Sequence, residues 1–268
     1  MLAYKINSKN IKNRIFIPKY YDPDLYAQIT ALGETHELLN LGDLLDSGVI
    51  TAQTGHEIGK MAYGTGNIPF VRTSDITNWE IKTIPKQGVS EDIYQLYAEK
   101  EDVQPGDILM VRDGTYLIGT NCIITPLDIP MVFQSHILKF RVVDSVVVDP
   151  YLLFLSFNCS LVQKQIKNMQ FTADIIDTLG NRYRELILPI PKDDAVKKEL
   201  ITSMKTALET RMKYKAAVKQ MPLLIEKVLE ANAVTPFDEF FSVPLEDLLS
   251  EIVQDTTTLE FGEFSAYK

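Results

Sequence analysis

Three short stretches of the 268-residue chain carry the residue types best suited to chemistry. Residues 64–76 place a glycine-bracketed loop before Arg72 and two hydroxyls, and residues 106–116 run from an apolar strand into Arg112, aspartate, glycine and threonine. Residues 133–142 join a polar cluster to alternating apolar and basic residues. Arginine forks, amides and hydroxyls hydrogen-bond to base edges and phosphates. Contact with DNA is therefore one function that these residue types could serve.

The role of each side chain follows from its hydrogen-bonding groups. Gln134 could pair with adenine, His136 and Lys139 suit phosphate, and an arginine fork could hold guanine or phosphate. Asp113 could accept from cytosine or orient Arg112. The candidate DNA contacts are Lys60, Tyr63, Arg72, Thr73, Ser74, Arg112, Asp113, Thr115, Tyr116, Gln134, Ser135, His136 and Thr172.

Two of these motifs also have a purely structural interpretation. Arg72 could pair with Asp75 while the glycines around it only turn the chain. Arg112 and Asp113 could form a salt-bridged strand end. Spacing alone leaves both interpretations open.

A catalytic, metal or cofactor site is not expected. Ser135 beside His136 lacks a Gly-x-Ser-x-Gly elbow, and His36 and His56 stand in unrelated contexts. The sequence contains no Asn-Pro-Pro-Tyr-like motif and no glycine-rich cofactor cradle. Its two cysteines are too few for a zinc cluster or a disulfide framework, and we expect them to be buried thiols.

Short strands are expected to position the candidate contacts. Glycine, proline, asparagine and aspartate break residues 41–148 into strand-like runs at 68–72, 79–84, 107–112, 119–125, 131–133 and 137–143. This spacing predicts a compact, mostly antiparallel β region. Helices are predicted over residues 25–39 and 151–168.

A long helix is predicted after residue 192, with Asp193 or Asp194 as its cap. Apolar residues at heptad spacing would form a coiled-coil seam through Leu200, Met204, Ala207, Tyr214, Val218, Met221 and Ile225. The alternative is an amphipathic helix folded on its own domain. Pro222 predicts a kink or a break, with a second helix beginning there.

The negative charge is concentrated at the C-terminal end. Of the formal net charge of −9, residues 237–268 contribute −7, which leaves −2 for residues 1–236. This tail is expected to be solvated or to dock a partner, and the sharper hypothesis places it on the DNA-binding surface when DNA is absent. No secretory leader and no membrane-spanning stretch is recognised, so a cytoplasmic protein is expected.

The order of the motifs resembles a known family. Residues 64–76 contain Ile-Pro, an apolar pair, arginine and Asp-Ile, and residues 106–116 contain Gly-Asp, apolar residues and Gly-Thr. The glutamine cluster follows, and residues 151–191 run from an apolar helix to Leu-Pro-Ile-Pro. In this order the stretches resemble a target-recognition domain of the specificity subunits of type I restriction-modification systems.

The resemblance implies an α+β fold with four parts. A basic, helical N-terminal extension covers residues 1–40, and a β-rich target-recognition domain covers residues 41–192. A coiled-coil-like spacer or dimerisation helix with a break near Pro222 covers residues 193–234, and the acidic tail covers residues 235–268. Family members carry two recognition domains and two spacer helices, so this chain corresponds to a half-subunit.

The resemblance further implies a non-catalytic protein without a cofactor. It would bind double-stranded DNA sequence-specifically and direct a DNA adenine methyltransferase, with or without a restriction or translocase subunit, in phage defence. The spacer helix would pair two copies as a homodimer, or the chain would serve one separate methyltransferase. The alternative class is a protein–protein adaptor of a restriction complex that has lost DNA reading.

Overall fold

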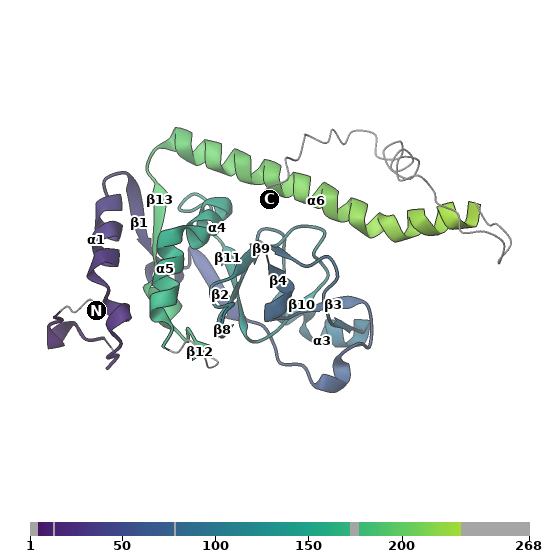
Figure 1. The fold of residues 1–268 in the computed structure, drawn as a ribbon, viewed down its shortest axis with the longest axis horizontal. Coiled ribbons are helices and arrows are strands. Elements are labelled where there is room, and N and C mark those ends of the chain that lie inside the picture. Colours follow the sequence, from purple (N-terminus) through teal and green to yellow (C-terminus); the bar gives the residue numbers. More distant parts are fainter. Residues whose placement is uncertain (1–4, 13, 78, 172–176, 232–268) are drawn as a thin grey trace, which may run out of the picture. The chain divides into compact units, whose positions relative to one another are not determined.

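A computed structural model of the chain describes residues 5–12, 14–77, 79–171 and 177–231 (Figure 1). The described residues divide into two units, the first ending at Met212 and the second beginning at Lys213. The fold is α+β, as expected, with several small sheets and one long helix. The acidic tail predicted at 235–268, like Thr172, lies outside the described residues.

The N-terminal segment belongs to the same unit as the β region. After the 3-10 helices Ser8–Asn10 and Pro18–Tyr21, helix α1 (Pro23–Leu32) begins at Asp22, which accepts hydrogen bonds from two backbone N–H groups of the first turn. Strand β1 (His36–Asn40) then pairs antiparallel with β13 (Ile187–Pro191).

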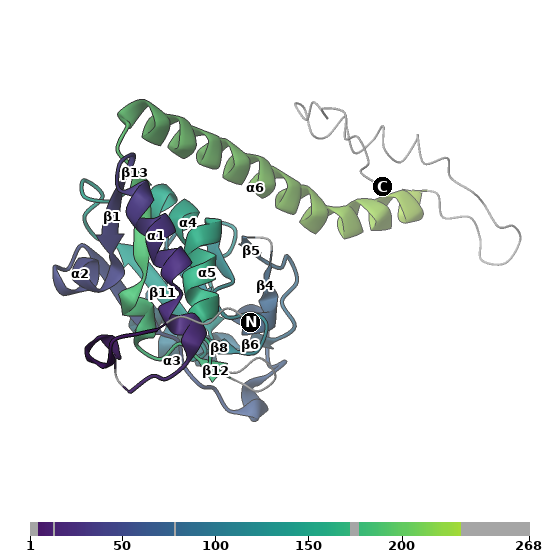
Figure 2. The same cartoon turned by 60° about the vertical axis from the view of Figure 1, so that its left-hand side comes forward.

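The helix predicted over residues 25–39 is therefore too long. It ends at Leu32, because the backbone groups of the following segment bond to a strand about 150 residues further along the chain. Helices α1 and α5 (Ser160–Met169) lie beside each other next to these two strands (Figure 2).

A four-stranded antiparallel sheet forms the centre of the unit, in the order β2-β11-β7-β9. These strands are Ile50–Thr54, Ile137–Val142, Ile108–Val111 and Asn121–Ile123. Alternate residues of β7 enter different cores: Ile108 and Met110 join one apolar cluster, Leu109 and Val111 another. Burial on both faces explains the unbroken apolar run in the second motif.

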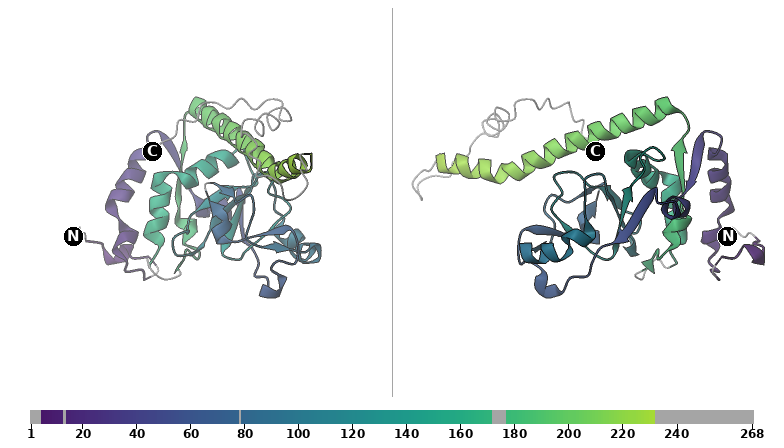
Figure 3. Two further views of the ribbon diagram at one scale, coloured as in Figure 1. Left: turned by 45° about the vertical axis from the view of Figure 1, so that its right-hand side comes forward. Right: turned by 180° about the vertical axis from the view of Figure 1, so that it is seen from behind.

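A smaller sheet with the order β10-β3-β6 lies next to the first. Strand β10 (Val132–Phe133) is parallel to β3 (Ile68–Val71), and β6 (Gly88–Val89) is antiparallel to β3. Helix α3 (Glu91–Glu101) packs on this sheet through apolar residues of its first turns. In Figure 3 this part of the unit lies at the opposite end from the N-terminal segment.

The remaining elements are short. They are α2 (Leu41–Asp46), the hairpin β4 (Ile76–Thr77) and β5 (Glu80–Ile81), the pair β8 (Asp113–Gly114) and β12 (Asp177–Thr178), and the 3-10 helices Lys60–Ala62, Thr73–Asp75 and Arg182–Glu185. The single helix predicted over 151–168 is two helices, α4 (Pro150–Asn158) and α5, because the backbone of Cys159 is extended at ψ 148°.

Helix α6 (Asp194–Ala231) begins after Asp193, whose carboxylate accepts from the N–H groups of Ala195 and Val196 at 2.7 and 3.3 Å. The predicted helix break near Pro222 is wrong, since α6 continues through this residue. Proline removes one helical hydrogen bond, but the turns on either side retain theirs. Among the described residues, no helix is long and apolar enough to span a bilayer.

Candidate nucleic-acid interface

Two neighbouring strands bring the first and third motifs together. Because β3 and β10 are parallel, with Val71 opposite Phe133, the residues that follow them emerge at the same end of the small sheet. Arg72 and Gln134 are these residues, and the Gln134 N–H donates to the Val71 carbonyl at 2.9 Å. Motifs about 60 residues apart therefore share one edge.

The second motif reaches the same region through the central sheet. Strands β7 and β11 are antiparallel, with Val111 opposite Ile137. The Arg112 N–H donates to the His136 carbonyl at 2.9 Å, so the end of β7 lies against the polar cluster of the third motif. The structure thus brings Arg112, Gln134 and His136 close together. The sequence alone showed only the order of these residues along the chain.

Asp113 organises the polar side chains at this edge. Its carboxylate accepts from Arg112 Nε and Nη2 at 2.9 and 2.7 Å, from the Thr178 hydroxyl, and contacts His136 Nδ1 at 3.0 Å. Burial alone raises the pKa of Asp113, but the hydrogen bonds from Arg112, Thr178 and His136 together hold that pKa below its ordinary value. Of the two roles open for Asp113, orienting Arg112 is the one that these contacts support.

Glu57 is a neighbour that the sequence did not single out. It accepts a hydrogen bond from the Ser135 hydroxyl, and its carboxylate lies 3.7 Å from His136 Nε2. His136 is therefore placed between the carboxylates of Glu57 and Asp113. Residue types alone could not reveal this, because Glu57 stands 79 positions before His136 in an unremarkable context.

The side chain of Arg72 is not held by Asp75. The Asp75 carboxylate accepts instead from the backbone N–H of Arg72 at 3.0 Å, and within the described residues no ion pair joins the two. The Arg72 guanidinium lies 6.0 Å from the Tyr63 ring centroid, and Tyr63 stacks on Phe70. Its Nε is buried without a hydrogen-bond partner in the described part of the chain. The structural interpretation of an Arg72–Asp75 pair is therefore wrong.

The two glycines of the first motif are needed for different reasons, Gly66 for close packing and Gly64 for its backbone conformation. A Cβ on Gly66 would lie 2.5 Å from the Val89 carbonyl oxygen, and Gly64 has a φ of +72°. Lys60 is exposed in the 3-10 helix before this loop. Thr73 and Ser74 are half-buried in the turn after β3, where the Ser74 carbonyl accepts from Lys82.

The remaining predicted contacts follow β8. Gly114 is the last residue of β8 and has a φ of +152°, a backbone conformation that favours glycine, and the chain bends after it at residues 115–116. Thr115 is half-buried, and Tyr116 is 85% exposed. Near β12, the Arg182 guanidinium lies 3.8 Å from the Phe171 ring centroid, another pair that sequence reasoning missed.

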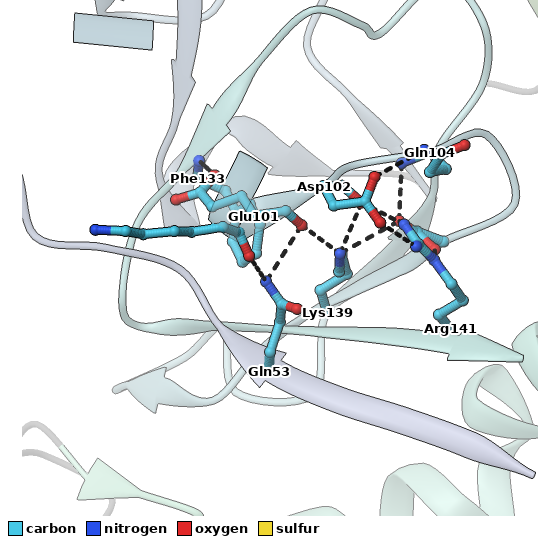
Figure 4. Close-up of polar contacts among 9 residues, drawn as sticks. Gln53, Glu101, Asp102, Gln104, Phe133, Lys139 and Arg141 are labelled. Carbon is cyan, nitrogen blue, oxygen red and sulfur yellow. Dashed lines mark hydrogen bonds and ion pairs between the residues drawn. The ribbon is translucent and has the colours of Figure 1, made fainter. Parts of the chain in front are cut away.

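A buried polar network around Glu101 supports the part of the small sheet from which Gln134 emerges (Figure 4). Glu101 is 1% exposed, and burial raises the pKa of its carboxyl although His56 and the Phe133 N–H both bond to it at 2.9 Å. His56 also contacts the Tyr97 ring, with centroids 5.0 Å apart. Glu101 thereby ties helix α3 to β10, the strand that leads into Gln134.

Lys139 does not contribute to the exposed interface. The structure buries it at the C-terminus of α3, where its ammonium donates to the carbonyls of Glu101 and Asp102 (Figure 4). Arg141 beside it donates to both Asp107 oxygens at 2.7 Å. Cations that cap helix carbonyls stabilise the helix end. The phosphate role suggested for Lys139 is therefore wrong.

No protein-family model and no curated protein matches the chain. The S subunit of a type I restriction-modification system from M. genitalium matches with a TM-score of 0.48 and 10% identity, covering 72% of this chain and 43% of that one. The chain is similar to an S subunit.

Two further solved structures also match. A structure described as explaining complex assembly and conformational transition of the type I R-M system has a TM-score of 0.43 and 16% identity, covering 78% of this chain and 50% of that one. The HsdS subunit from Thermoanaerobacter tengcongensis has a TM-score of 0.40 and 16% identity, covering 74% and 45%. The chain spans half or less of the length of these three matching chains.

The predicted helix seam has two environments. Met204 is buried in the core of residues 1–212, and Leu200 packs against that core. Ala207 is exposed, and in the second unit Tyr214, Met221 and Ile225 are exposed while Val218 is half-buried. The early turns of α6 therefore follow the amphipathic interpretation, and the later turns present apolar side chains.

Proposed function

We propose that the chain is a non-catalytic DNA-specificity subunit of a restriction-modification system, which directs a DNA adenine methyltransferase to its target site. The observation that carries the proposal is the convergence of Arg72, Arg112, Gln134 and His136, from separate strands, at one edge of two rigid sheets. Side chains held on strands are positioned well enough to read base edges.

Each group has a role in this proposal. The fork of Arg112, fixed by the Asp113 carboxylate, donates to guanine, and Gln134 pairs with adenine. The guanidinium of Arg72, beside the Tyr63 ring, donates to a phosphate or a base, and the exposed Tyr116 contacts a phosphate. The carboxylate of Glu57 disfavours phosphate at Ser135 and His136, which leaves these residues to base edges.

In the assembly that we propose, α6 pairs two copies of the chain. A two-fold dimer would bind a symmetric bipartite site, because protein symmetry matches half-site symmetry. The methyltransferase, and a restriction subunit where one is present, would complete the complex. The exposed apolar side chains of Tyr214, Met221 and Ile225 support this arrangement.

Selection from a random-sequence duplex pool with the full-length chain tests the proposal. We expect a bipartite, two-fold symmetric sequence to be enriched, with an affinity that falls steeply as salt rises. A chain that enriches no sequence and shows no salt-dependent duplex binding would be an adaptor instead, and the proposal would be wrong.

A further inference from the structure

An open polar depression of about 500 Å³ borders Arg112. It is lined by side chains from β2, the end of α3, β11 and the segment after β12. The polar lining residues are Gln53, Thr54, His56, Lys100, Arg112 and Asn181. Apart from Arg112, none of them belongs to the DNA contacts expected from the sequence.

The lining of the depression contains basic but no acidic side chains among the described residues. The basic side chains are those of His56, Lys100 and Arg112. The acids closest to these bases are already engaged, because Asp113 bonds to Arg112 and Glu101 bonds to His56. An anion placed here would meet no opposing carboxylate from the lining.

The depression also contains hydrogen-bond donors without a partner, and neighbouring hydrogen bonds hold the backbone and side chains around them in place. Within the described residues, the ammonium of Lys100 and the amide of Asn181 make no hydrogen bond or ion pair. The Gln53 amide donates to the carbonyls of Lys100 and Glu101 at 2.9 and 3.2 Å, which holds the backbone from which Lys100 projects. His56 is fixed by Glu101 at 2.9 Å.

We propose that this depression binds a phosphate group of the DNA backbone, with Lys100, His56 and Asn181 as its ligands. Ammonium, imidazole and amide N–H groups are phosphate donors, and phosphate contacts set the register of a protein on the duplex. The inference rests on the proposed function and adds to it: Arg112 at the border reads a base while the depression anchors the adjoining backbone.

The variant Lys100→Gln tests the site, and Lys19→Gln is its control, since Lys19 is exposed on the N-terminal 3-10 helix Pro18–Tyr21. Fluorescence anisotropy with a random-sequence duplex is measured over a salt series. We expect Lys100→Gln to bind about five-fold more weakly at low salt and to lower the salt slope by about 1, with Lys19→Gln unchanged. Equal losses in both variants, or none in Lys100→Gln, would overturn the proposal.

A titration with inorganic phosphate tests whether the bound phosphate group belongs to DNA or is free phosphate. Phosphate is titrated into the full-length chain while the His56 imidazole is followed by NMR, and we expect a saturable shift that Lys100→Gln weakens. Phosphate binding without any duplex binding would overturn DNA as the source, together with the proposed function. Duplex binding that Lys100→Gln leaves intact would overturn this inference alone.

Discussion

At the scale of single residues, binding at the interface depends on which polar groups already have a hydrogen-bond partner within the chain. Asp113 is committed to Arg112, His136 and Thr178, whereas the Nη1 of Arg112 has no hydrogen-bond partner among the described residues. A guanidinium held on one side by a carboxylate keeps its free edge in one orientation. This arrangement makes Arg112 the strongest candidate for reading a base.

Replacing Arg112 with alanine is expected to cost about 1–3 kcal/mol in binding to the selected sequence and to relax preference at one base position. Competition binding with single-base variants of the site measures both effects. Arg184→Ala is a matched control, since Arg184 pairs with Asp46 outside the interface. Equal weakening on selected and random duplexes would instead make Arg112 a phosphate contact.

Lowering the pH should reveal how much Asp113 contributes to the free energy of unfolding. Its pKa is lower in the folded chain than in the unfolded chain, so it stabilises the fold above its ordinary pKa of about 4, and that stability is lost as the pH falls through the folded value. We expect Asp113→Asn to be less stable than the wild type at neutral pH, with a gap that narrows below about pH 4. Urea unfolding across this range measures the gap, and a constant difference would contradict the assignment.

At the scale of elements, the approach of β2 to β10 determines where Gln134 lies. Gly55 follows β2, and a Cβ on it would lie 2.0 Å from the Phe133 carbonyl oxygen. The next residue, His56, forms a parallel bridge with Gln134. Only glycine allows the two backbones to come this close.

The variant Gly55→Ala is therefore expected to lower the free energy of unfolding by about 2 kcal/mol or more, because backbone rather than a movable side chain must shift. Gly59→Ala is the matched control: its Cβ would meet nothing within 4 Å, and the change should stay within about 0.5 kcal/mol. Chemical denaturation of both variants measures the difference. Equal stabilities would show that the strands separate without cost.

At the scale of the whole molecule, the exposed turns of α6 predict the oligomeric state. In the second unit, Tyr214 and Ile225 are 64% and 40% exposed. Apolar side chains at heptad spacing are buried when two helices pair. The chain should therefore form a dimer through this part of α6.

The double variant Tyr214→Glu and Ile225→Glu is expected to be a monomer, since it places charge in the seam. The control Gln220→Glu adds charge at an exposed position outside the seam and is expected to remain a dimer. Light scattering over a concentration series measures the mass of each protein. A wild type that stays monomeric at every concentration, or a control that dissociates as readily as the double variant, would contradict a dimer through α6.

The sequence by itself determined the features with strong local signals. The apolar run of β7, the glycine-favoured backbone conformation of Gly114 and the Asp193 cap were all predictable, because residue type and near neighbours decide them. The order of the motifs also predicted which stretches carry the candidate contacts. None of these features needs a partner distant in the chain.

Only the tertiary structure decided the rest. Residues 36–40 are a strand because β13 supplies their hydrogen bonds, and Lys139 is buried because the end of α3 lies over it. The ammonium of Lys100 has no hydrogen-bond partner among the described residues, because no acceptor is brought close to it by the fold, whereas the Lys100 carbonyl accepts from Gln53. Long-range pairing determines which backbone and polar groups are satisfied, and residue types along the chain do not record that pairing.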